Sequence, residues 1–369
     1  MDSVAAWLIL HHAPTVGAVT FVKALEQFGS PQAVLDCGPT ALRQSGVFKK
    51  AAVEYLTAPE SEQLQSIERD LEWLEQEGSH ILTLEDEAYP ALLKEITDPP
   101  PLLYVQGQVD LLSMPQLAIV GSRNPDALGR EMAQDFAQRL ARAGLTITSG
   151  MALGIDTEAH HGALQGGTTI AVTGTGLDRV YPARNRELAH QIAIQGALIS
   201  ELAIGTEPRA ENFPRRNRLI SGLALGTLVV QSARKSGSLI TARLAMEQGR
   251  EVFAIPGSIH NPLSRGNHLL IRQGAKLVET TEDVVEELGG MLHLLETQLE
   301  DEVTDLEPPS EDSVEGQILA AIGYETVQLD QIVKLCGLTA EVVSPIIMRL
   351  EIEGLIASLP GGRVQRLQK

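Results

Sequence analysis

The sequence predicts an α/β protein in which an extended Rossmann-like domain with a parallel sheet is flanked by a small helical module and a winged helix. Three observations support this architecture. Short apolar runs alternate with helical segments between about residues 80 and 290. Helical patterns precede this region, and three more helical patterns with a β-hairpin pattern follow it.

The composition is that of a globular protein. Hydrophobic residues make up 43% of the 369 residues, and 48 acids against 29 Lys and Arg give a net charge of −19. Disordered and collagen-like classes are therefore excluded. Cys37 and Cys336 lack the spacing of a disulfide framework or a zinc site. No run approaches the ~18 apolar residues that a membrane span needs, so we expect a cytoplasmic protein without metal, cofactor or membrane partner.

Residues 1–75 are predicted to form a helical module of the SAM or helix-hairpin-helix type. Apolar residues recur at helical spacing in two stretches, namely at Phe21, Leu25 and Phe28 and at Leu64, Ile67, Leu71 and Leu74. A glycine turn at Gly17 is able to present backbone N–H groups to a DNA phosphate, but the lysine usual near such a turn is absent. We favour a structural module and keep phosphate binding as the alternative.

Residues 80–290 are predicted to form the parallel sheet and its covering helices. The expected strands cover residues 117–120, 145–148, 169–174, 197–200, 227–232 and 251–257. Between the first two strands, an apolar residue recurs every four positions, at Leu128, Met132, Phe136 and Leu140. This pattern predicts a crossover helix with one buried face.

An acidic linker at residues 291–312 is predicted to precede the winged helix at 313–369. From Glu279 to Asp312 there are thirteen acids and no Lys or Arg. The winged helix is expected to contain three helices and two short strands joined by residues 360–362. Its presumed recognition helix carries one Arg and three Glu, which is poorly suited to reading a DNA groove. Protein docking and nucleic-acid binding both stay open.

The charge is distributed unevenly along the chain. Between Arg209 and Lys276 there are eleven Lys or Arg and three acids, a local charge of +8. The rest of the chain has 18 basic residues and 45 acids, a charge of −27. A basic cleft focuses potential locally even in an acidic protein, so the total charge does not exclude a polyanionic ligand.

Glycine-rich polar loops follow several of the predicted strands. In an open α/β sheet ligands bind outside the carboxyl ends of the strands, and glycines let backbone N–H groups approach an anion. The candidate residues in these loops are Gly121, Ser122, Arg123, Ser149, Gly150, Gly154, Lys235, Ser236, Gly237 and Ser238. None of the loops has a P-loop or a complete GxGxxG pattern, which argues against a triphosphate or classical dinucleotide site.

The segment AENFPRRNRLI, residues 210–220, is the densest cationic motif. Arg215, Arg216 and Arg218 surround Asn217 at a predicted helix start, where cations oppose the helix dipole and suggest a polyanionic partner. Phe213 provides a ring for stacking on an unpaired base. In the alternative interpretation, Phe213 belongs to the core and the arginines pair with surface acids.

Asp156 and His160 lie four residues apart on a predicted helix, a spacing that two metal ligands also use. Because no further ligand has fitting spacing, we favour a capping Asp and a hydrogen-bonded His. No triad or pair of carboxylates in the loops predicts catalysis.

Six strings between about residues 117 and 278 closely resemble the DprA/Smf family, the DNA-processing proteins of natural transformation. They are IVGSR, ITSGMALGIDTEAHHGAL, TGTGLDRVYPARNREL, NFPRRNRLISGL, KSGSLITARLAMEQGREVFAIPG and SRGNHLLIRQGAKLV. The resemblance implies a non-enzymatic protein that binds and protects incoming single-stranded DNA without sequence preference. It also implies a homodimer through the Rossmann-like domain that helps load the RecA recombinase.

The resemblance also implies which residues contact DNA. The best contacts are Arg123 with the arginines and Phe213 of NFPRRNR, and residues 236–238 complete the pocket. Many members carry a Lys where this chain has Ala210. Either the neighbouring Arg209 substitutes for that lysine or one phosphate contact is missing.

Two other functions are alternatives to DNA binding. Phosphoribohydrolases of the LOG-like type share the glycine loops and carry a PGGxGTxxE motif with a catalytic Glu, but here KSGSLIT puts Thr241 at that position. A threonine does not replace a carboxylate in stabilising an oxocarbenium ion. The third possibility is an interaction module in which the winged helix docks a protein.

Overall fold

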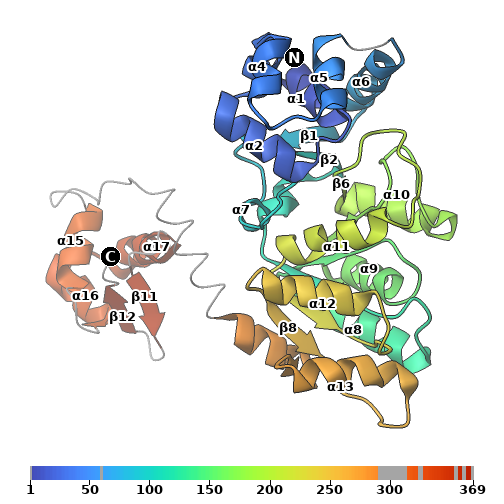
Figure 1. Cartoon of the computed structure of the whole chain (residues 1–369). Helices are drawn as coiled ribbons and strands as arrows, with labels where there is room; N and C mark the ends of the chain where they lie inside the picture. The colour runs from blue at the N-terminus through green and yellow to red at the C-terminus, as the bar shows by residue number, and fades with distance from the viewer. Residues whose placement is uncertain are drawn as a thin grey trace. The chain divides into compact units, whose positions relative to one another are not determined.

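The computed structural model describes residues 2–58, 61–289, 314–322, 327–352, 356–359 and 363–366 (Figure 1). The chain forms two compact units, Met1–Leu294 and Leu295–Lys369. The predicted acidic linker at 291–312 lies outside the described residues. Within the described ranges, no helix has the length and apolar character to cross a membrane.

The first unit begins with a helical module (blue in Figure 1). Its helices are α1 (Asp2–His12), α2 (Ala18–Phe28), α3 (Pro31–Asp36), α4 (Pro39–Gln44), α5 (Lys50–Thr57) and α6 (Ser61–Leu74). On α6 the predicted stripe holds in part, because Ile67 is buried whereas Leu64 is 42% exposed. The fully buried Asp70 lies on the same face of α6 as Ile67.

A nine-stranded sheet follows, in the order β1-β2-β6-β5-β4-β3-β7-β8-β9. The strands are β1 (Ser79–Thr83), β2 (Leu102–Gly107), β3 (Gln116–Val120), β4 (Thr146–Ser149), β5 (Thr169–Val172), β6 (Ala197–Ser200), β7 (Gly226–Val229), β8 (Glu251–Ala254) and β9 (Lys276–Leu277). Neighbouring strands from β6 to β9 are parallel, whereas β1 and β2 pair antiparallel at one edge. The predicted Rossmann-like sheet is therefore confirmed, and β1, β2 and β9 extend it.

Helices cover both faces of this sheet. They are α7 (Ala91–Lys94), α8 (Ala127–Arg142), α9 (Ile155–Gly166), α10 (Arg186–Gln195), α11 (Asn212–Leu223), α12 (Ser238–Glu247) and α13 (Arg265–Arg272), with short 3₁₀ helices at Val109–Ser113, Ala183–Asn185 and Pro262–Ser264 and a further helix at 281–289. α8 packs on α9 against one face, and α11 packs on α12 against the other (Figure 1). Any side chain at Gly162 of α9 would collide with the carbonyl oxygen of Gln134 in α8, so this glycine permits the close packing.

The buried face of α8 differs from the predicted one. Phe136 and Leu140 are buried together with Ala133 and Ala137, but Leu128 is 61% exposed. Residues four apart advance about 40° around a helix with 3.6 residues per turn. Over three such steps the stripe therefore leaves the buried face.

The helical module and the sheet share one continuous hydrophobic cluster. Trp7 and Phe21 stack inside the module with ring centroids 5.3 Å apart. The ring centroids of Trp73 in α6 and Tyr104 in β2 lie 5.8 Å apart. The module is thereby packed onto the antiparallel edge of the sheet.

The second unit has the predicted winged-helix elements. They are α15 (Val314–Ile322), α16 (Leu329–Cys336), α17 (Ala340–Ile352), β11 (Ile356–Leu359) and β12 (Arg363–Arg366), with an additional strand β10 (Val327–Gln328) paired with β12. Apolar residues from all three helices, among them Ile318, Ile332 and Leu350, form its core. The predicted turn at 360–362 lies outside the described residues.

Candidate nucleic-acid interface

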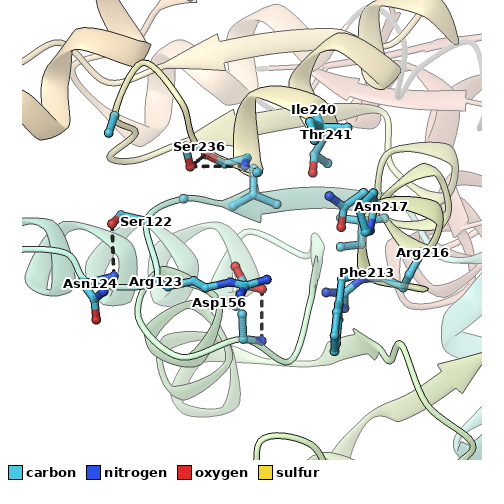
Figure 2. Close-up of a pocket in the computed structure, with 18 of the residues that line it drawn as sticks. Ser122, Arg123, Asn124, Asp156, Phe213, Arg216, Asn217, Ser236, Ile240 and Thr241 are labelled. Carbon is cyan, nitrogen blue, oxygen red and sulfur yellow. Dashed lines mark hydrogen bonds between the residues drawn. The ribbon is translucent and has the colours of Figure 1, made fainter. Parts of the chain in front are cut away.

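The strand order reverses between β3 and β7, and a cavity of about 740 Å³ lies beyond the carboxyl ends of these strands. Such a reversal is where open α/β sheets bind ligands, because the loops of adjacent strands diverge there. The walls come from residues 120–124, from the start of α9, from α11 and from the loop at 233–238 (Figure 2).

One wall of the cavity is a single face of α11. Phe213, Arg216, Asn217 and Ile220 line it, and their spacing of three, four and seven residues places them on one side of a helix. Arg215 and Arg218 belong to other faces of the same helix, because each residue turns the chain by about 100°.

Arg216 is a buried cation in this wall. It is 6% exposed and donates a hydrogen bond to the carbonyl oxygen of Val172. Its Nε has no hydrogen-bond partner among the described residues. Burial lowers the pKa of Arg216 to about 10, so it remains charged at neutral pH and is available to an anion in the cavity.

Among the described residues that line the cavity, Asp156 is the only one with a carboxylate. It lies in the first turn of α9. Its Oδ2 accepts a hydrogen bond from the amide of Ala152 at 3.3 Å. A side chain at Gly150 would collide with both Asp156 and the guanidinium of Arg216, so glycine is required beside these two charged groups. Burial raises the pKa of Asp156 to about 6, and the positive charges of Arg216 and Arg123 oppose that shift.

Two aromatic rings and an arginine meet at the rim of the cavity. The rings of Tyr181 and Phe213 lie 5.6 Å apart with their planes tilted by 35°. The guanidinium carbon of the exposed Arg123 lies 5.9 Å from the centroid of Phe213. Both rings also line an adjoining cavity of about 290 Å³. A ring face and a guanidinium group are therefore offered side by side.

The serine-rich loop after β7 forms the opposite wall. Ser236 and Ser238 share a hydrogen bond of 2.7 Å between their hydroxyls, and Ser238 donates to Ser232 at 3.1 Å. These bonds hold the loop in front of α12, whose N-terminus carries a partial positive charge. Lys235, in the same loop, is exposed and lines the cavity.

The structure brings together most of the sequence-predicted site residues. Those that line the cavity are Gly121, Ser122, Arg123, Phe213, Arg216, Asn217, Lys235, Ser236, Gly237 and Ser238. Ser149 is fully buried and donates to the carbonyl oxygen of Ile119 at 2.6 Å. Gly154 has a positive φ of 88°, which favours glycine, and lies against the carbonyl oxygens of Ser122 and Arg123. Ser149, Gly150 and Gly154 therefore do not line the cavity, but they support the conformation of the loops that do.

Three predicted arginines lie outside the cavity. Arg209 is exposed next to Pro208 and Ala210, which line it. Arg215 lines a separate cavity of about 300 Å³ against the helical module. Arg218 is buried and pairs with Asp98 at 2.9 Å and with Glu201 at 2.6 Å. Arg218 therefore belongs to the scaffold and not to the cavity, contrary to the expectation from the sequence.

Sequence reasoning missed Tyr181 and favoured a capping role for Asp156 over metal binding, whereas the N-cap of α9 is Gly154. Tyr181 lies in the loop after β5, one of the loops that parallel-strand geometry brings to this edge of the sheet. That rule was a usable signal for Tyr181. The burial of Asp156 beside Arg216 had no local signal, because it depends on how the start of α9 and the first turns of α11 meet at the carboxyl ends of the strands.

His160 is a hydrogen-bonded core residue, as predicted. Its Nε2 donates to the carbonyl oxygen of Gly150 at 2.7 Å, and its Nδ1 lies 2.7 Å from the hydroxyl of Thr169. Burial lowers its pKa to about 4, so the ring is neutral. Across the described ranges, no group of three or more His, Cys, Asp or Glu side chains is arranged to hold a metal.

Comparison with known proteins identifies the family of the chain. The sequence model of a family described as DNA recombination-mediator protein A matches residues 80–289, which is more than half of the chain. The chain belongs to the DprA/Smf family. A DprA-like N-terminal HHH domain matches residues 2–61, and the DprA winged helix domain matches residues 302–362.

Proteins with similar sequences occur in several bacteria. Protein Smf of Escherichia coli K12 is 43% identical over 326 residues, which cover 88% of this chain and 86% of that protein. The DNA processing protein DprA of Streptococcus pneumoniae is 49% identical over 203 residues, covering 55% of this chain and 72% of that protein.

Solved structures of the family have the same fold. DprA from Streptococcus pneumoniae superposes with a TM-score of 0.67 at 38% identity, over 76% of this chain and 95% of that chain. DprA from Helicobacter pylori, solved in a study of its single-stranded DNA binding mode, gives a TM-score of 0.51 at 31% identity, over 60% of this chain and 97% of that chain.

Proposed function

We propose that this protein binds single-stranded DNA in the 740 Å³ cavity, without reading the base sequence, and helps load the RecA recombinase during natural transformation. The observation that carries the DNA-binding part is the convergence of two arginines, Arg123 and Arg216, with the rings of Phe213 and Tyr181. Family membership and the single-stranded DNA binding named for the Helicobacter pylori relative support it.

The chemistry of the cavity favours single strands over duplex. Guanidinium groups bind phosphates of either form, but a ring stacks only on a base whose face is accessible. In a duplex the neighbouring base pairs cover those faces, so Phe213 and Tyr181 gain a partner only from an unpaired strand. Every base has such a face, which makes binding independent of sequence.

Loading of RecA and a homodimer through the Rossmann-like domain complete the proposal. The family description as a recombination mediator supports the loading step. A DNA strand that binds at one edge of the sheet leaves the rest of its length accessible to a recombinase. In a dimer, the second protomer would bind the same strand at a high effective concentration, which would increase the overall affinity.

We further propose that the protein has no catalytic activity of the phosphoribohydrolase type. Thr241 is 2% exposed in the cavity wall, at the position where those enzymes carry their catalytic Glu. Asp156 lies at the start of a different helix and faces Arg216. Incubation with nucleoside monophosphates and chromatography for free base tests this proposal, and release of base would contradict it.

The test of DNA binding compares fluorescence anisotropy of labelled single-stranded and duplex oligonucleotides of equal length. We expect tighter binding of the single strand and a loss of affinity in Arg123→Ala. The matched control is Arg243→Ala, which removes an exposed charge from the same basic segment of the chain but not from the cavity. Equal affinity for single strand and duplex would overturn the proposal. A strand-exchange assay with RecA and a competing single-strand-binding protein tests the loading step.

A further inference from the structure

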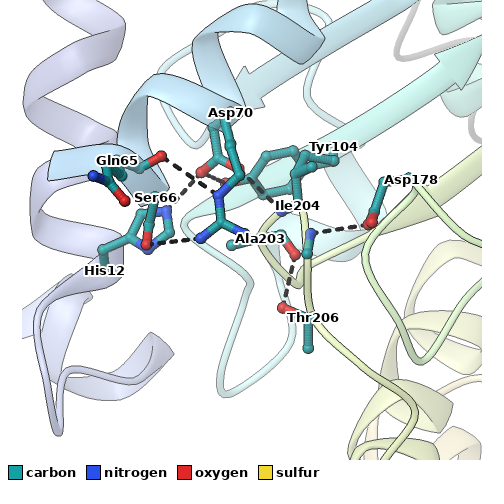
Figure 3. A network of polar contacts seen from close by, with 11 residues as sticks. His12, Gln65, Ser66, Asp70, Tyr104, Asp178, Ala203, Ile204 and Thr206 are labelled. Atoms are coloured by element: carbon teal, nitrogen blue, oxygen red, sulfur yellow. Dashed lines mark hydrogen bonds and ion pairs between the residues drawn. The ribbon is translucent and has the colours of Figure 1, made fainter. Parts of the chain in front are cut away.

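The turn at residues 203–206, which leads from β6 towards α11, is held by two carboxylates from different parts of the first unit. The amide of Ile204 donates to Asp70 Oδ1 at 2.9 Å. The next amide, that of Gly205, donates to Asp178 Oδ1 at 2.9 Å. Figure 3 shows the turn between Asp70 of the helical module and Asp178 of the loop after β5.

Asp70 is a fully buried carboxylate with several donors. Its Oδ2 accepts a hydrogen bond from the hydroxyl of Tyr104 at 2.8 Å and lies 2.6 Å from Nε2 of His12. Together with the amide of Ile204, these donors come from α1, from β2 and from the turn. Burying a carboxylate without hydrogen-bond donors destabilises the folded protein. The hydrogen bond from Ile204 to Asp70 therefore fixes the position of the turn relative to the helical module.

On its other side, the turn is tied to the loop that carries Tyr181. Besides the bond from Gly205 to Asp178, the amide of Gly176 donates to the carbonyl oxygen of Thr206 at 3.1 Å. The turn closes on itself because Ala203 accepts hydrogen bonds from the amide and the hydroxyl of Thr206. The turn is therefore a compact element with fixed partners on both sides.

The chain that follows the turn forms part of the DNA cavity. Pro208 and Ala210 line the cavity, and Phe213 begins the cavity face of α11. The loop on the other side of the turn supplies Tyr181. A displacement of the turn would thus move the two segments that carry the aromatic rings relative to each other.

We propose that Asp70 is a positioning residue for DNA binding: through Ile204 it makes the helical module a brace that holds the two ring-bearing walls of the cavity in register. This inference rests on the proposed function. Asp70 is fully buried and lies outside the residues that line the cavity, so its role is to position the walls of the cavity and not to contact DNA. Because coupling between sites is reciprocal, a bound strand also stabilises the contact between the turn and the module.

The experiment compares Asp70→Ala, Asp70→Asn and Val34→Ala in the full chain. Asn retains a side-chain oxygen for the amide of Ile204, whereas Ala removes it. Val34 is a fully buried residue of α3, so Val34→Ala weakens the module without touching the turn. Two quantities are measured: hydrogen–deuterium exchange of peptides covering residues 201–213 without DNA, and affinity for a labelled oligothymidine.

We expect Asp70→Ala to exchange faster in 201–213 and to bind about tenfold more weakly. Asp70→Asn should retain most of the affinity, and Val34→Ala should leave both quantities unchanged in the folded protein. The salt dependence of binding should stay that of the wild type in every variant, because no phosphate contact is removed.

The brace is overturned if exchange in 201–213 is unchanged in Asp70→Ala, or if Val34→Ala loses affinity to the same extent. If Asp70→Ala does not fold, Asp178→Ala cuts the second tie at a solvent-accessible position and must give the same faster exchange. If the wild type binds no oligonucleotide, the proposed function fails, whereas the exchange data still decide whether Asp70 holds the turn.

Discussion

Tyr181 and Phe213 place their rings 5.6 Å apart at the mouth of the cavity, one from the loop after β5 and the other from the first turn of α11. Phe213 also faces the guanidinium of Arg123 at 5.9 Å. Tyr181 is 49% exposed although it is a large aromatic residue. An exposed aromatic ring beside a cationic cavity is suited to stacking on an unpaired base.

We expect Phe213→Ala and Tyr181→Ala each to weaken binding of single-stranded DNA. The loss of one stacked base corresponds to about 1–3 kcal/mol, or roughly five- to 150-fold in affinity. Titration with an oligothymidine measures this loss. A strand of abasic sites is the matched control, because it keeps the phosphates and removes the stacking partners; equal losses for both strands would argue that the rings do not stack on bases.

Arg123→Ala should lower the salt dependence of binding as well as the affinity. Each phosphate neutralised on a single strand contributes a slope of about −0.7 in the logarithm of the association constant against log salt. Affinities at four or more salt concentrations measure the slope, which should become shallower by about 0.7 for one lost contact. Arg243→Ala should leave the slope unchanged, and a change of equal size there would point to a diffuse charge effect.

Asp156 predicts a pH dependence of stability. Burial raises its pKa in the folded protein to about 6, above the ordinary aspartate value of about 4. An acid with a raised folded pKa binds more protons in the folded than in the unfolded chain, so its contribution to stability falls as the pH rises from about 4 to about 6. Relative to Asp156→Asn, the wild type should lose about 3 kcal/mol over this range.

Denaturant unfolding of both proteins at several pH values measures this difference. Other titrating groups contribute equally to the two proteins and cancel. A difference that is constant between pH 4 and pH 7 would show that the carboxyl of Asp156 is not perturbed by burial.

Arg218→Ala is expected to reduce stability rather than intrinsic DNA affinity. Its guanidinium is buried between Glu201 and Asp98, and removing one partner of a buried pair costs about 3 kcal/mol. Chemical denaturation should show this loss, while the folded fraction binds DNA with the affinity of the wild type. Arg215→Ala, on the same helix but at an exposed position, should leave stability within about 0.5 kcal/mol.

Much of the fold was predictable because it depends on local patterns. The strands β3 to β8 are short apolar runs between glycine-rich turns, and every predicted strand among them overlaps an observed one. β9 has two residues and β1 and β2 pair at the edge, so their patterns are too short or too mixed to distinguish from loops. The predicted domain boundaries stay predictions, since the helical module and the sheet share one core.

For the arginines of α11, the periodicity of the helix predicts part of the site but not all of it. Helical phase separates Arg216 from Arg215 and Arg218, and this follows from the sequence once the helix is accepted. Which of these faces borders the cavity depends on the direction in which α11 crosses the sheet. Arg216 was therefore identifiable as different from its neighbours, but its role was not.

By itself, the sequence determined the succession of strands and helices, the glycine-rich loops at the strand ends and the basic segment between Arg209 and Lys276, because each depends on residues that are neighbours in the chain. Only the tertiary structure decided which of those residues share a cavity and which are bound into the scaffold. The contacts of Tyr181 with Phe213 and of Asp70 with Ile204 join segments far apart in sequence. They arise from the strand order and from the packing of the helical module, which no local periodicity encodes.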